Sequence, residues 1–509
     1  MAAAPVWSVD PRTGKQREQV AVEATAEELD EVVRAAHTAR AALADRTVRA
    51  AFLRTAADLL EDAEGHLVEV ADAESALGPV RLNGELARTR YQLRAFAGIV
   101  DEGAFLDVVI DHPDATATPP VPDLRRYKVP LGVVAVYAAS NFPFAFSVAG
   151  GDTASALAAG CPVVVKAHPD HPALSELVAS VLRRAAARHG IPAGVVGLVH
   201  GFEAGVELVR HPLVAAAGFT GSVRGGRALF DAAARRPVPI PFHGELGSLN
   251  PVLVTAAAAA ERAEEIGAGL AGSMTLGVGQ FCVKPGLVLV PAGAAGDRLL
   301  KSLTDAVSDT EAGVLLDHRM RDNFIAGVAE RTGLPDVASP VTPGAGGEHT
   351  VSPGYLTVPA GRLTAEGEHD LLLEECFGPL TVVARYTDAA EAGAVLSRLP
   401  GNLTATVQLS AEEAAGEGRG AEILAELTPL AGRVLVNGWP TGVAVAPAQH
   451  HGGPYPATTS TSTSVGGTAI ERWMRPVAYQ GVPEPLLPPE LRDANPLGLP
   501  RRYDGRLER

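Results

Sequence analysis

The sequence predicts an α/β protein built on parallel sheets that helices cover on both faces. From Gly132 onward, short runs rich in valine alternate with helical stretches, and a second series of this kind follows Asn250. Strands of a parallel sheet are buried on both faces, so they are continuously apolar and do not alternate. At 509 residues the chain is too long for one core, and two or three domains are expected.

The composition narrows the class of protein. A hydrophobic content of 47% with 20% charged residues is typical of a globular protein, and the net charge of −16 argues against nucleic acid or an anionic membrane as partner. The cysteines are sparse and odd in number, which indicates a reducing compartment: Cys161, Cys282 and Cys376. The first residues lack the pattern of a signal peptide, and no apolar run approaches about 18 residues. We therefore expect a cytoplasmic protein.

The chain begins with helices. Thr25 and Glu28 form a candidate capping box, and amphipathic runs follow around Phe52 and Leu86 at helical spacing. We interpret these runs as packing helices with no chemistry of their own. Residues 111–122 are rich in proline and aspartate and form a connection, and residues 125–130 are expected to be an exposed strand.

The next part predicts a Rossmann-like half. The expected strands are 133–137, 163–166, 195–199, 215–219 and 238–242. The expected helices are 151–159, 173–188, 203–210 and 224–235. Sheets of this kind bind ligands beyond the carboxyl ends of their strands, so the residues after each strand are the candidates for a site.

The second half predicts another α/β unit. Its expected strands are 287–290, 381–385, 404–409 and 434–437, and its expected helices are 256–270, 299–308, 388–397 and 411–426. Residues 458–464 are almost all threonine and serine. Composition alone permits disorder there, although an ordered loop at the rim of an active site is our interpretation.

Polar residues follow the strands of the Rossmann-like half. Asn141 comes after the first strand, Lys166 ends the second, and Thr220-Gly-Ser222 follows the fourth. A Thr-Gly-Ser turn at a helix N-terminus presents free N–H groups that suit a pyrophosphate. It is equally consistent with an ordinary serine N-cap, and the G-x-G-x-x-G motif is absent.

A single cysteine, Cys282, lies in a bend rich in glycine that runs from Gly277 to Gly286. Glycines allow tight turns and a close approach of ligand to backbone. Cysteine is nucleophilic as the thiolate, so its usual pKa of about 8.5 must be lowered and its sulfur must stay reachable. The alternative is a packed cysteine without chemistry, because free cysteine is among the most buried residue types.

Six short motifs together resemble the aldehyde dehydrogenase superfamily over nearly the whole chain. They are Asn141-Phe-Pro, Val164-Val-Lys166, Phe219-Thr-Gly-Ser222, Glu245-Leu-Gly247 with Asn250-Pro251, Gly279-Gln-Phe-Cys282 and Glu375-Cys-Phe-Gly-Pro379. Within this superfamily the chain is most similar to the branch of NADP-dependent bacterial aldehyde dehydrogenases and α-ketoglutarate semialdehyde (2,5-dioxopentanoate) dehydrogenases. Ser248-Leu249 and the stretch that begins at His451-Gly-Gly-Pro fit that branch.

The resemblance implies three structural parts. A Rossmann-like cofactor-binding domain is expected over residues 1–110 and 133–247, and an α/β catalytic domain over residues 248–450. Residues 111–132 and 467–509 would form a small β oligomerisation element with the C-terminal tail. Residues 475–480 are similar to the strand with which family members complete a neighbour's sheet, so a homodimer or homotetramer is expected.

The resemblance also assigns the chemistry. Cys282 would attack the aldehyde carbonyl to give a thiohemiacetal, and the Asn141 amide with the Cys282 backbone N–H would stabilise the oxyanion. Hydride transfer to the nicotinamide would leave a thioester. Glu245 would then activate the water that hydrolyses it.

Five residues would hold the cofactor. By resemblance they are Lys166, Gly221 and Ser222 for the adenosine and pyrophosphate end, and Glu375 and Phe377 for the nicotinamide ribose. For Lys166 the alternative is an exposed charge at a strand end, and for Glu375 a solvated acid.

NADP is the expected cofactor, with NAD as the alternative. NAD-selective relatives commonly place a glutamate three residues after the strand-end lysine, and a carboxylate there would repel a 2′-phosphate. Pro169 occupies this position, Lys166 supplies a cation, and His168 or His171 would add a donor when protonated. Glu203 is the residue that would restore the repulsion if it lay near the end of the third strand.

The aldehyde remains open at this stage. Phe142, Phe146 and Phe281 would line an aromatic tunnel to Cys282 by family position, which favours medium-chain or aromatic aldehydes. The branch resemblance favours 2,5-dioxopentanoate, which becomes 2-oxoglutarate on oxidation. A substrate of that kind needs a cation near the tunnel mouth, and none is evident from the sequence.

Three alternatives to the dehydrogenase hypothesis are considered. A CoA-acylating or cysteine-hydrolase enzyme is disfavoured because Glu245 is present, and a silent binding protein because the chemical positions are intact. The pairs His168 with His171 and His450 with His451 suggest a metal, but further ligands of a zinc site are not evident. No metal is expected.

Overall fold

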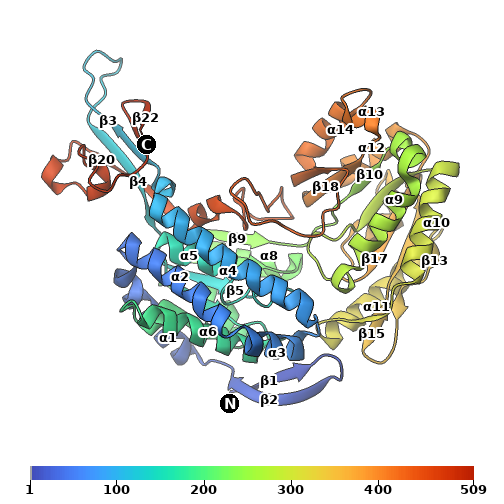
Figure 1. The fold of residues 1–509 in the computed structure, drawn as a ribbon, viewed down its shortest axis with the longest axis horizontal. Coiled ribbons are helices and arrows are strands. Elements are labelled where there is room, and N and C mark those ends of the chain that lie inside the picture. The colour runs from blue at the N-terminus through green and yellow to red at the C-terminus, as the bar shows by residue number, and fades with distance from the viewer. Residues whose placement is uncertain (1–2, 509) are drawn as a thin grey trace.

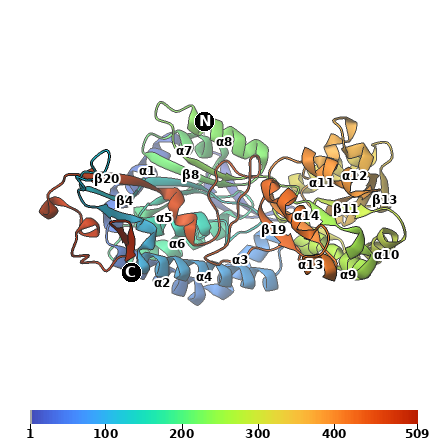
Figure 2. The same cartoon turned by 90° about the horizontal axis from the view of Figure 1, so that it is seen from above.

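The computed structural model describes residues 3–508 and contains two parallel α/β domains with a separate β element (Figure 1). The cofactor-binding domain lies on the left of Figure 1, the catalytic domain on the right, and the β element projects at the upper left. Figure 2 shows the same three parts from above. Within the described residues, no helix is both long and apolar enough to cross a bilayer.

The cofactor-binding domain is built on a sheet of five parallel strands in the order β7-β6-β5-β8-β9. Its strands are β5 (Val133–Tyr137), β6 (Val163–Lys166), β7 (Val196–Val199), β8 (Val214–Thr220) and β9 (Phe242–Glu245). Its connecting helices are α5 (Gly151–Ala159), α6 (Pro172–Ala187), α7 (Phe202–Arg210) and α8 (Val223–Ala234). The N-terminal part adds β1 (Pro5–Asp10), β2 (Lys15–Val22), α1 (Ala26–Ala39), α2 (Arg46–Asp62), α3 (Glu64–Ser75) and α4 (Pro79–Glu102). The predicted capping box at Thr25 and Glu28 is confirmed.

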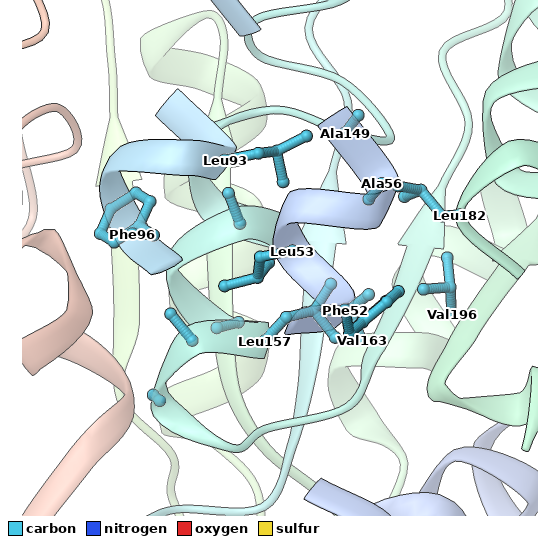
Figure 3. Close-up of a cluster of buried hydrophobic side chains, with 14 of the residues drawn as sticks. Phe52, Leu53, Ala56, Leu93, Phe96, Ala149, Leu157, Val163, Leu182 and Val196 are labelled. Atoms are coloured by element: carbon cyan, nitrogen blue, oxygen red, sulfur yellow. The ribbon is translucent and has the colours of Figure 1, made fainter. Parts of the chain in front are cut away.

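Alternate residues of each central strand enter two different cores. Val134 and Val136 of β5 pack with α2, α4, α5 and α6, whereas Val133 and Ala135 pack with α1, α7 and α8. Figure 3 shows the first core, where Phe52 of α2 lies against the sheet. Full burial of a large apolar side chain contributes about 1.5–3 kcal/mol to the stability of the fold. A strand covered by helices on both sides is therefore most stable when its residues are apolar on both faces.

The catalytic domain is built on a sheet of seven strands in the order β13-β16-β17-β11-β10-β18-β19, of which β13 alone is antiparallel to its neighbour. Its main strands are β10 (Val252–Val254), β11 (Leu287–Pro291), β13 (Ala338–Val341), β16 (Gly354–Pro359), β17 (Leu380–Tyr386), β18 (Asn402–Gln408) and β19 (Ala431–Val436). A small second sheet holds β12 (Gly313–Val314), β14 (Gly344–Ala345) and β15 (Thr350–Ser352). The helices are α9 (Ala256–Thr275), α10 (Ala294–Ser308), α11 (His318–Thr332), α12 (Ala389–Arg398), α13 (Ala411–Ala414) and α14 (Gly420–Leu427).

Two predicted elements are wrong in detail. The strand expected at 238–242 lies at 242–245, because prolines at 237, 239 and 241 cannot donate the hydrogen bonds of a central strand. The helix expected at 411–426 is two helices, since Gly416 and Gly418 adopt positive φ of 95° and 67° between them. The sequence analysis did not find β10, β16 or α11.

The β element is a sheet of five strands in the order β20-β4-β3-β21-β22. Its strands are β3 (Val108–Asp111), β4 (Leu124–Pro130), β20 (Met474–Gln480), β21 (Arg501–Tyr503) and β22 (Arg506–Glu508). β20 pairs with β4 in antiparallel register and stands at the edge of the sheet. β3 begins at Val108, so this element starts slightly before the predicted boundary at residue 111.

Candidate active site

The two domains meet at a groove of about 740 Å³ at the carboxyl ends of their strands. Seven of the predicted site residues line it: Asn141, Gly221, Ser222, Glu245, Cys282, Glu375 and Phe377. α11 forms part of the wall on the side of the catalytic domain. The groove lies where parallel sheets bind ligands, so the structure brings together residues that are far apart in the chain.

The bend before Cys282 is held by unusual backbone conformations. Gly277, Val278 and Gly279 have successive φ values of 56°, 58° and 66°. Positive φ is strained for a β-branched residue such as Val278, and strain of this kind concentrates at functional sites. A Cβ at Gly279 would lie 2.4 Å from the carbonyl oxygen of Gly378, so only glycine fits where these two loops touch.

Asn250 fixes the other side of the bend. Its Nδ2 donates to the carbonyl oxygens of Cys282, at 2.8 Å, and Lys284, at 3.0 Å. Its Oδ1 accepts from the backbone N–H of Thr404 on β18. Asn250 therefore links the backbone around Cys282 to strand β18 by hydrogen bonds.

Glu245, at the end of β9, is the centre of a buried network. His451 Nε2 lies 2.9 Å from Glu245 Oε1 and 3.7 Å from Cys282 Sγ, and Ser464 Oγ donates to Glu245 Oε2 at 2.8 Å. His451 is completely buried and Glu245 is 3% exposed. The stretch that carries His451 and Ser464 crosses this site, where Leu246 N–H donates to Ala457 O at 2.7 Å.

The surroundings shift the pKa values of Glu245 and Cys282 in opposite directions. Burial raises the pKa of Glu245, but His451, Ser464 and the Cys282 thiol together lower it below its ordinary value. Burial, followed by the charge of Glu245, raises the pKa of the Cys282 thiol well above its usual range. The carboxylate is therefore ionised while the cysteine rests as a thiol that donates to it.

Asn141 follows β5 in the chain and is buried in the site. Its Nδ2 donates one N–H to the carbonyl oxygen of Gln280 at 3.1 Å. A side-chain amide carries two N–H donors, so the second remains for a ligand. The Asn141 backbone oxygen accepts a hydrogen bond of 2.6 Å from Arg81 Nη2 on α4, which anchors this turn.

The cofactor end of the groove lies at the N-terminus of α8. Ser222 caps this helix, with its Oγ accepting from Gly225 N–H at 3.2 Å, and Arg224 on the first turn also lines the groove. Ser222 is thus an N-cap, and the helix end still suits the phosphates of a dinucleotide. Lys166 is half-buried nearby, and burial lowers its pKa while Asp170 opposes that shift. These residues fit NAD(P).

The other end of the groove holds the acidic side chain of Glu375, with the buried Lys284 behind it. Burial raises the pKa of Glu375 to about 7, against the stabilising effects of the Lys284 ammonium and the Ser248 backbone N–H. Burial lowers the pKa of Lys284 to about 8, and its Nζ donates to the Leu380 carbonyl oxygen. Glu375 is half-buried and lines the groove, so it is not a fully solvated acid.

The three predicted tunnel residues lie together. The ring centroids of Phe142 and Phe146 are 5.4 Å apart, as are those of Phe142 and Phe281. Phe146 also lies beside His451, with ring centroids 6.4 Å apart. Apolar and aromatic surface therefore adjoins the buried network on the side away from the cofactor groove.

The remaining candidates have structural contacts. His171 is buried, with its ring nitrogens on Ala139 O and Ser175 Oγ, so it is not free to bind a metal. Cys161 is fully buried in the first core, and its Sγ donates to Trp473 O at 3.4 Å. Cys376 is half-buried and lines the groove.

A Rossmann-like domain and a second α/β domain meet around the half-buried Cys282, which is the arrangement expected of a nucleotide-dependent oxidoreductase. Residues 2–466 match the aldehyde dehydrogenase family. The chain belongs to this family and is an NAD(P)-dependent aldehyde dehydrogenase family enzyme, as its motifs predicted.

Similar proteins cover the whole chain. It is 45% identical to alpha-ketoglutaric semialdehyde dehydrogenase 2 of Azospirillum brasilense, across 100% of this chain and 97% of the relative. It is 42% identical to alpha-ketoglutaric semialdehyde dehydrogenase of Acinetobacter baylyi, across 95% of this chain and 92% of the relative. A crystal structure described as that of an E. coli NADP dependent enzyme has a TM-score of 0.78 at 25% identity, covering 93% of this chain and 94% of that one.

Four residues of the site were not found from the sequence. His451 was noted in the stretch His451-Gly-Gly-Pro and as a candidate metal ligand, but its direct contact with Glu245, 206 positions away in the chain, was not predicted. Asn250 was noted only within a motif, and Lys284 was passed over beside Cys282. Arg88 was assigned to a packing helix. Polar side chains recur every three or four residues on α4, and this spacing could have indicated a polar face of the helix.

Proposed function

We propose that this enzyme oxidises an aldehyde to a carboxylate through a thiohemiacetal and a thioester on Cys282. The observation that supports this most is the contact network of Cys282, His451 and Glu245, beside the free N–H of Asn141. These are a nucleophile, a base with its positioning partner and an oxyanion donor, all reachable from one groove.

The thiol of Cys282 gives its proton to the Glu245 carboxylate as the sulfur attacks the aldehyde carbon. The oxyanion that develops accepts hydrogen bonds from Asn141 Nδ2 and the Cys282 backbone N–H. Removal of one such donor typically costs about 10²–10³ in rate. NAD(P), when bound at the groove, supplies the hydride acceptor that converts the thiohemiacetal into a thioester.

The thioester is then hydrolysed. Glu245 first releases the thiol proton to solvent. It then takes a proton from a water molecule, which attacks the thioester carbonyl. The acid leaves and the sulfur takes up a proton. His451 and Ser464 hold the two oxygens of Glu245 in place through both steps. A general base of this kind contributes about 10²–10⁴ in rate.

The substrate we favour is 2,5-dioxopentanoate, which gives 2-oxoglutarate. Two relatives that match this chain over nearly their whole length, at 45% and 42% identity, carry the name of that activity. The alternative is a medium-chain or aromatic aldehyde, supported by the cluster of Phe142, Phe146 and Phe281. CoA acylation is disfavoured, because Glu245 is held as an ionised base beside the cysteine.

One set of assays tests the mechanism and separates these substrates. NAD(P)H formation is followed by absorbance with a panel of aldehydes, with and without CoA. The Glu245→Gln variant should form NAD(P)H more slowly than the wild type, because the thiol has lost its base, and should stop at one equivalent as the thioester. A rate equal to that of the wild type, or NAD(P)H formation that continues beyond one equivalent, would contradict the role of Glu245. A dependence on CoA would support the acylating alternative.

NADP is the cofactor we favour. Pro169 leaves no carboxylate at the position that selects NAD, but the neighbouring Asp170 also lines the groove. Burial and the nearby Asp317 raise the pKa of Asp170 well above its usual range, which weakens the repulsion that its carboxyl group would exert on a 2′-phosphate. Lys166 and Arg224 supply cations there. A preference for NAD of more than about tenfold in kcat/KM, roughly 1.4 kcal/mol, would contradict this proposal.

A homodimer or homotetramer is also proposed. β20 is an edge strand, and an edge presents unpaired backbone groups that another chain can complete. Light scattering coupled to gel filtration would find a monomer if this is wrong.

A further inference from the structure

One face of α4 carries four polar side chains that each keep one buried polar atom without a partner. They are Arg81, Glu85, Arg88 and Gln92, spaced so that they follow one another along a single helical face. Each has a buried atom without a hydrogen-bond partner among residues 3–508: Arg81 Nη1, Glu85 Oε2, Arg88 Nη1 and Gln92 Nε2. Buried polar atoms without partners are rare in native proteins, so a row of them indicates that something else binds there.

The two guanidinium groups lie on the aromatic cluster of the site. Arg81 Cζ lies 5.2 Å from the ring centroid of Phe142 and 4.6 Å from that of Phe281. Arg88 Cζ lies 5.4 Å from the ring centroid of Phe146. Guanidinium groups stack on aromatic rings while their N–H donors stay free at the edge. The surface that suggested an apolar tunnel therefore also carries positive charge.

The charges on this face do not cancel within the protein. Glu85 is the carboxylate between the two arginines, but its Oε1 is occupied by the backbone N–H groups of Phe144, at 2.8 Å, and Ala145, at 2.9 Å. Burial lowers the pKa of Arg88, and the charges of Glu85, Cys282 and Glu245 act on it in the opposite direction. Arg88 lies over Phe146, whose ring adjoins His451, and His451 contacts Cys282, so the guanidinium group is close to the reacting cysteine.

We propose that Arg88, supported by Arg81, binds a carboxylate on the aldehyde substrate, so that the substrate class is a semialdehyde with a distal acid group. This inference rests on the proposed attack of Cys282 on the aldehyde. A carboxylate would supply the charge-assisted hydrogen bonds that the free guanidinium N–H groups lack. A purely apolar aldehyde would leave Nη1 of Arg88 and of Arg81 buried without a partner, which is costly.

The test compares two aldehydes that differ only in the acid group. The ratio of kcat/KM for 5-oxopentanoate to kcat/KM for pentanal is measured in each preparation, so the fraction of active enzyme cancels. The wild type should favour 5-oxopentanoate. Arg88→Met should lower the ratio by about 10- to 100-fold, and Arg88→Lys by less. Arg90→Met is the matched control, because Arg90 lies on the same helix but pairs with Glu64 of α3, and it should leave the ratio unchanged.

The outcomes separate the two proposals. If Arg88→Met keeps the wild-type ratio while both aldehydes are oxidised, the carboxylate site is refuted and the mechanism stands. If the wild type oxidises neither of these nor any other aldehyde of the panel, the proposed function fails. Should Arg88→Met not fold, glutarate is tested against the wild type with pentanal as substrate. Competitive inhibition by glutarate that neutral pentanamide does not reproduce supports the site, and equal inhibition by both refutes it.

Discussion

Replacement of His451 by leucine should move the acid limb of the pH profile toward higher pH. His451 Nε2 donates to Glu245 Oε1 at 2.9 Å in a site where both side chains are buried. Burial alone would raise the pKa of Glu245, and the contact with His451 is the largest of the effects that lower it. Leucine removes this donor and leaves the burial in place.

The size of the shift follows from the energy of one hydrogen bond. Loss of a hydrogen bond to a buried charged group costs about 1.5–3 kcal/mol, and one pKa unit corresponds to about 1.4 kcal/mol. The pKa of Glu245 should therefore rise by about 1–2 units. A base acts only when it is ionised, so activity that is present above this pKa is lost as the pH falls through it. The variant loses activity at a higher pH than the wild type.

The assay is kcat against pH from about 4 to 9 with saturating aldehyde and cofactor. His451→Gln keeps a neutral N–H donor and should shift the acid limb less than His451→Leu. His450→Leu is the matched control, because His450 is next to His451 in the chain but its ring is not a hydrogen-bond partner of Glu245. An acid limb at the same pH in the wild type and in His451→Leu would refute the reasoning.

The remaining predictions concern the nucleophile, the cofactor site and the bend. Cys282→Ala should abolish NAD(P)H formation while circular dichroism and cofactor binding by fluorescence stay normal; wild-type turnover would exclude it as the nucleophile. Lys284→Met should raise the pKa of Glu375 above about 7, so the KM for NADP should rise at pH 7 and recover at higher pH. A KM that is independent of pH would contradict this. Gly279→Ala forces a Cβ against Gly378 O and should lower the free energy of unfolding by about 1–3 kcal/mol, which denaturant titration would measure.

The sheets were largely predictable because their residues carry a strong local signal. The bounds of β5, β6 and α5 match the prediction, since valine runs form the strands and Gly160, with φ of 97°, ends the helix. β10 has only three residues, and α11 has few apolar ones, so neither produces a clear period. Their identity is decided by neighbours distant in the chain, which no local pattern shows.

The site was predictable where a motif carries it and not where folding assembles it. Cys282, Glu245 and Asn141 stand in recognisable short patterns. The stretch that begins at His451 indicated only the family branch, and the role of His451 depends on a loop that returns across β9. Arg88 looks like an ordinary charge on an amphipathic helix, and only the packing of α4 against the phenylalanine rings shows that it is buried beside the cysteine.

The network around Glu245 explains how one carboxylate can serve two steps of a reaction. It must first accept the thiol proton and later accept one from water, so it must lose the first proton in between. A carboxyl buried without partners would keep that proton, because burial favours the neutral form. His451 and Ser464 instead favour the charged form and lower the pKa. These donors make Glu245 a weaker base in both steps, but they return it to the ionised state before hydrolysis. The carboxylate needed for hydrolysis is therefore obtained at the cost of a weaker base for the thiol.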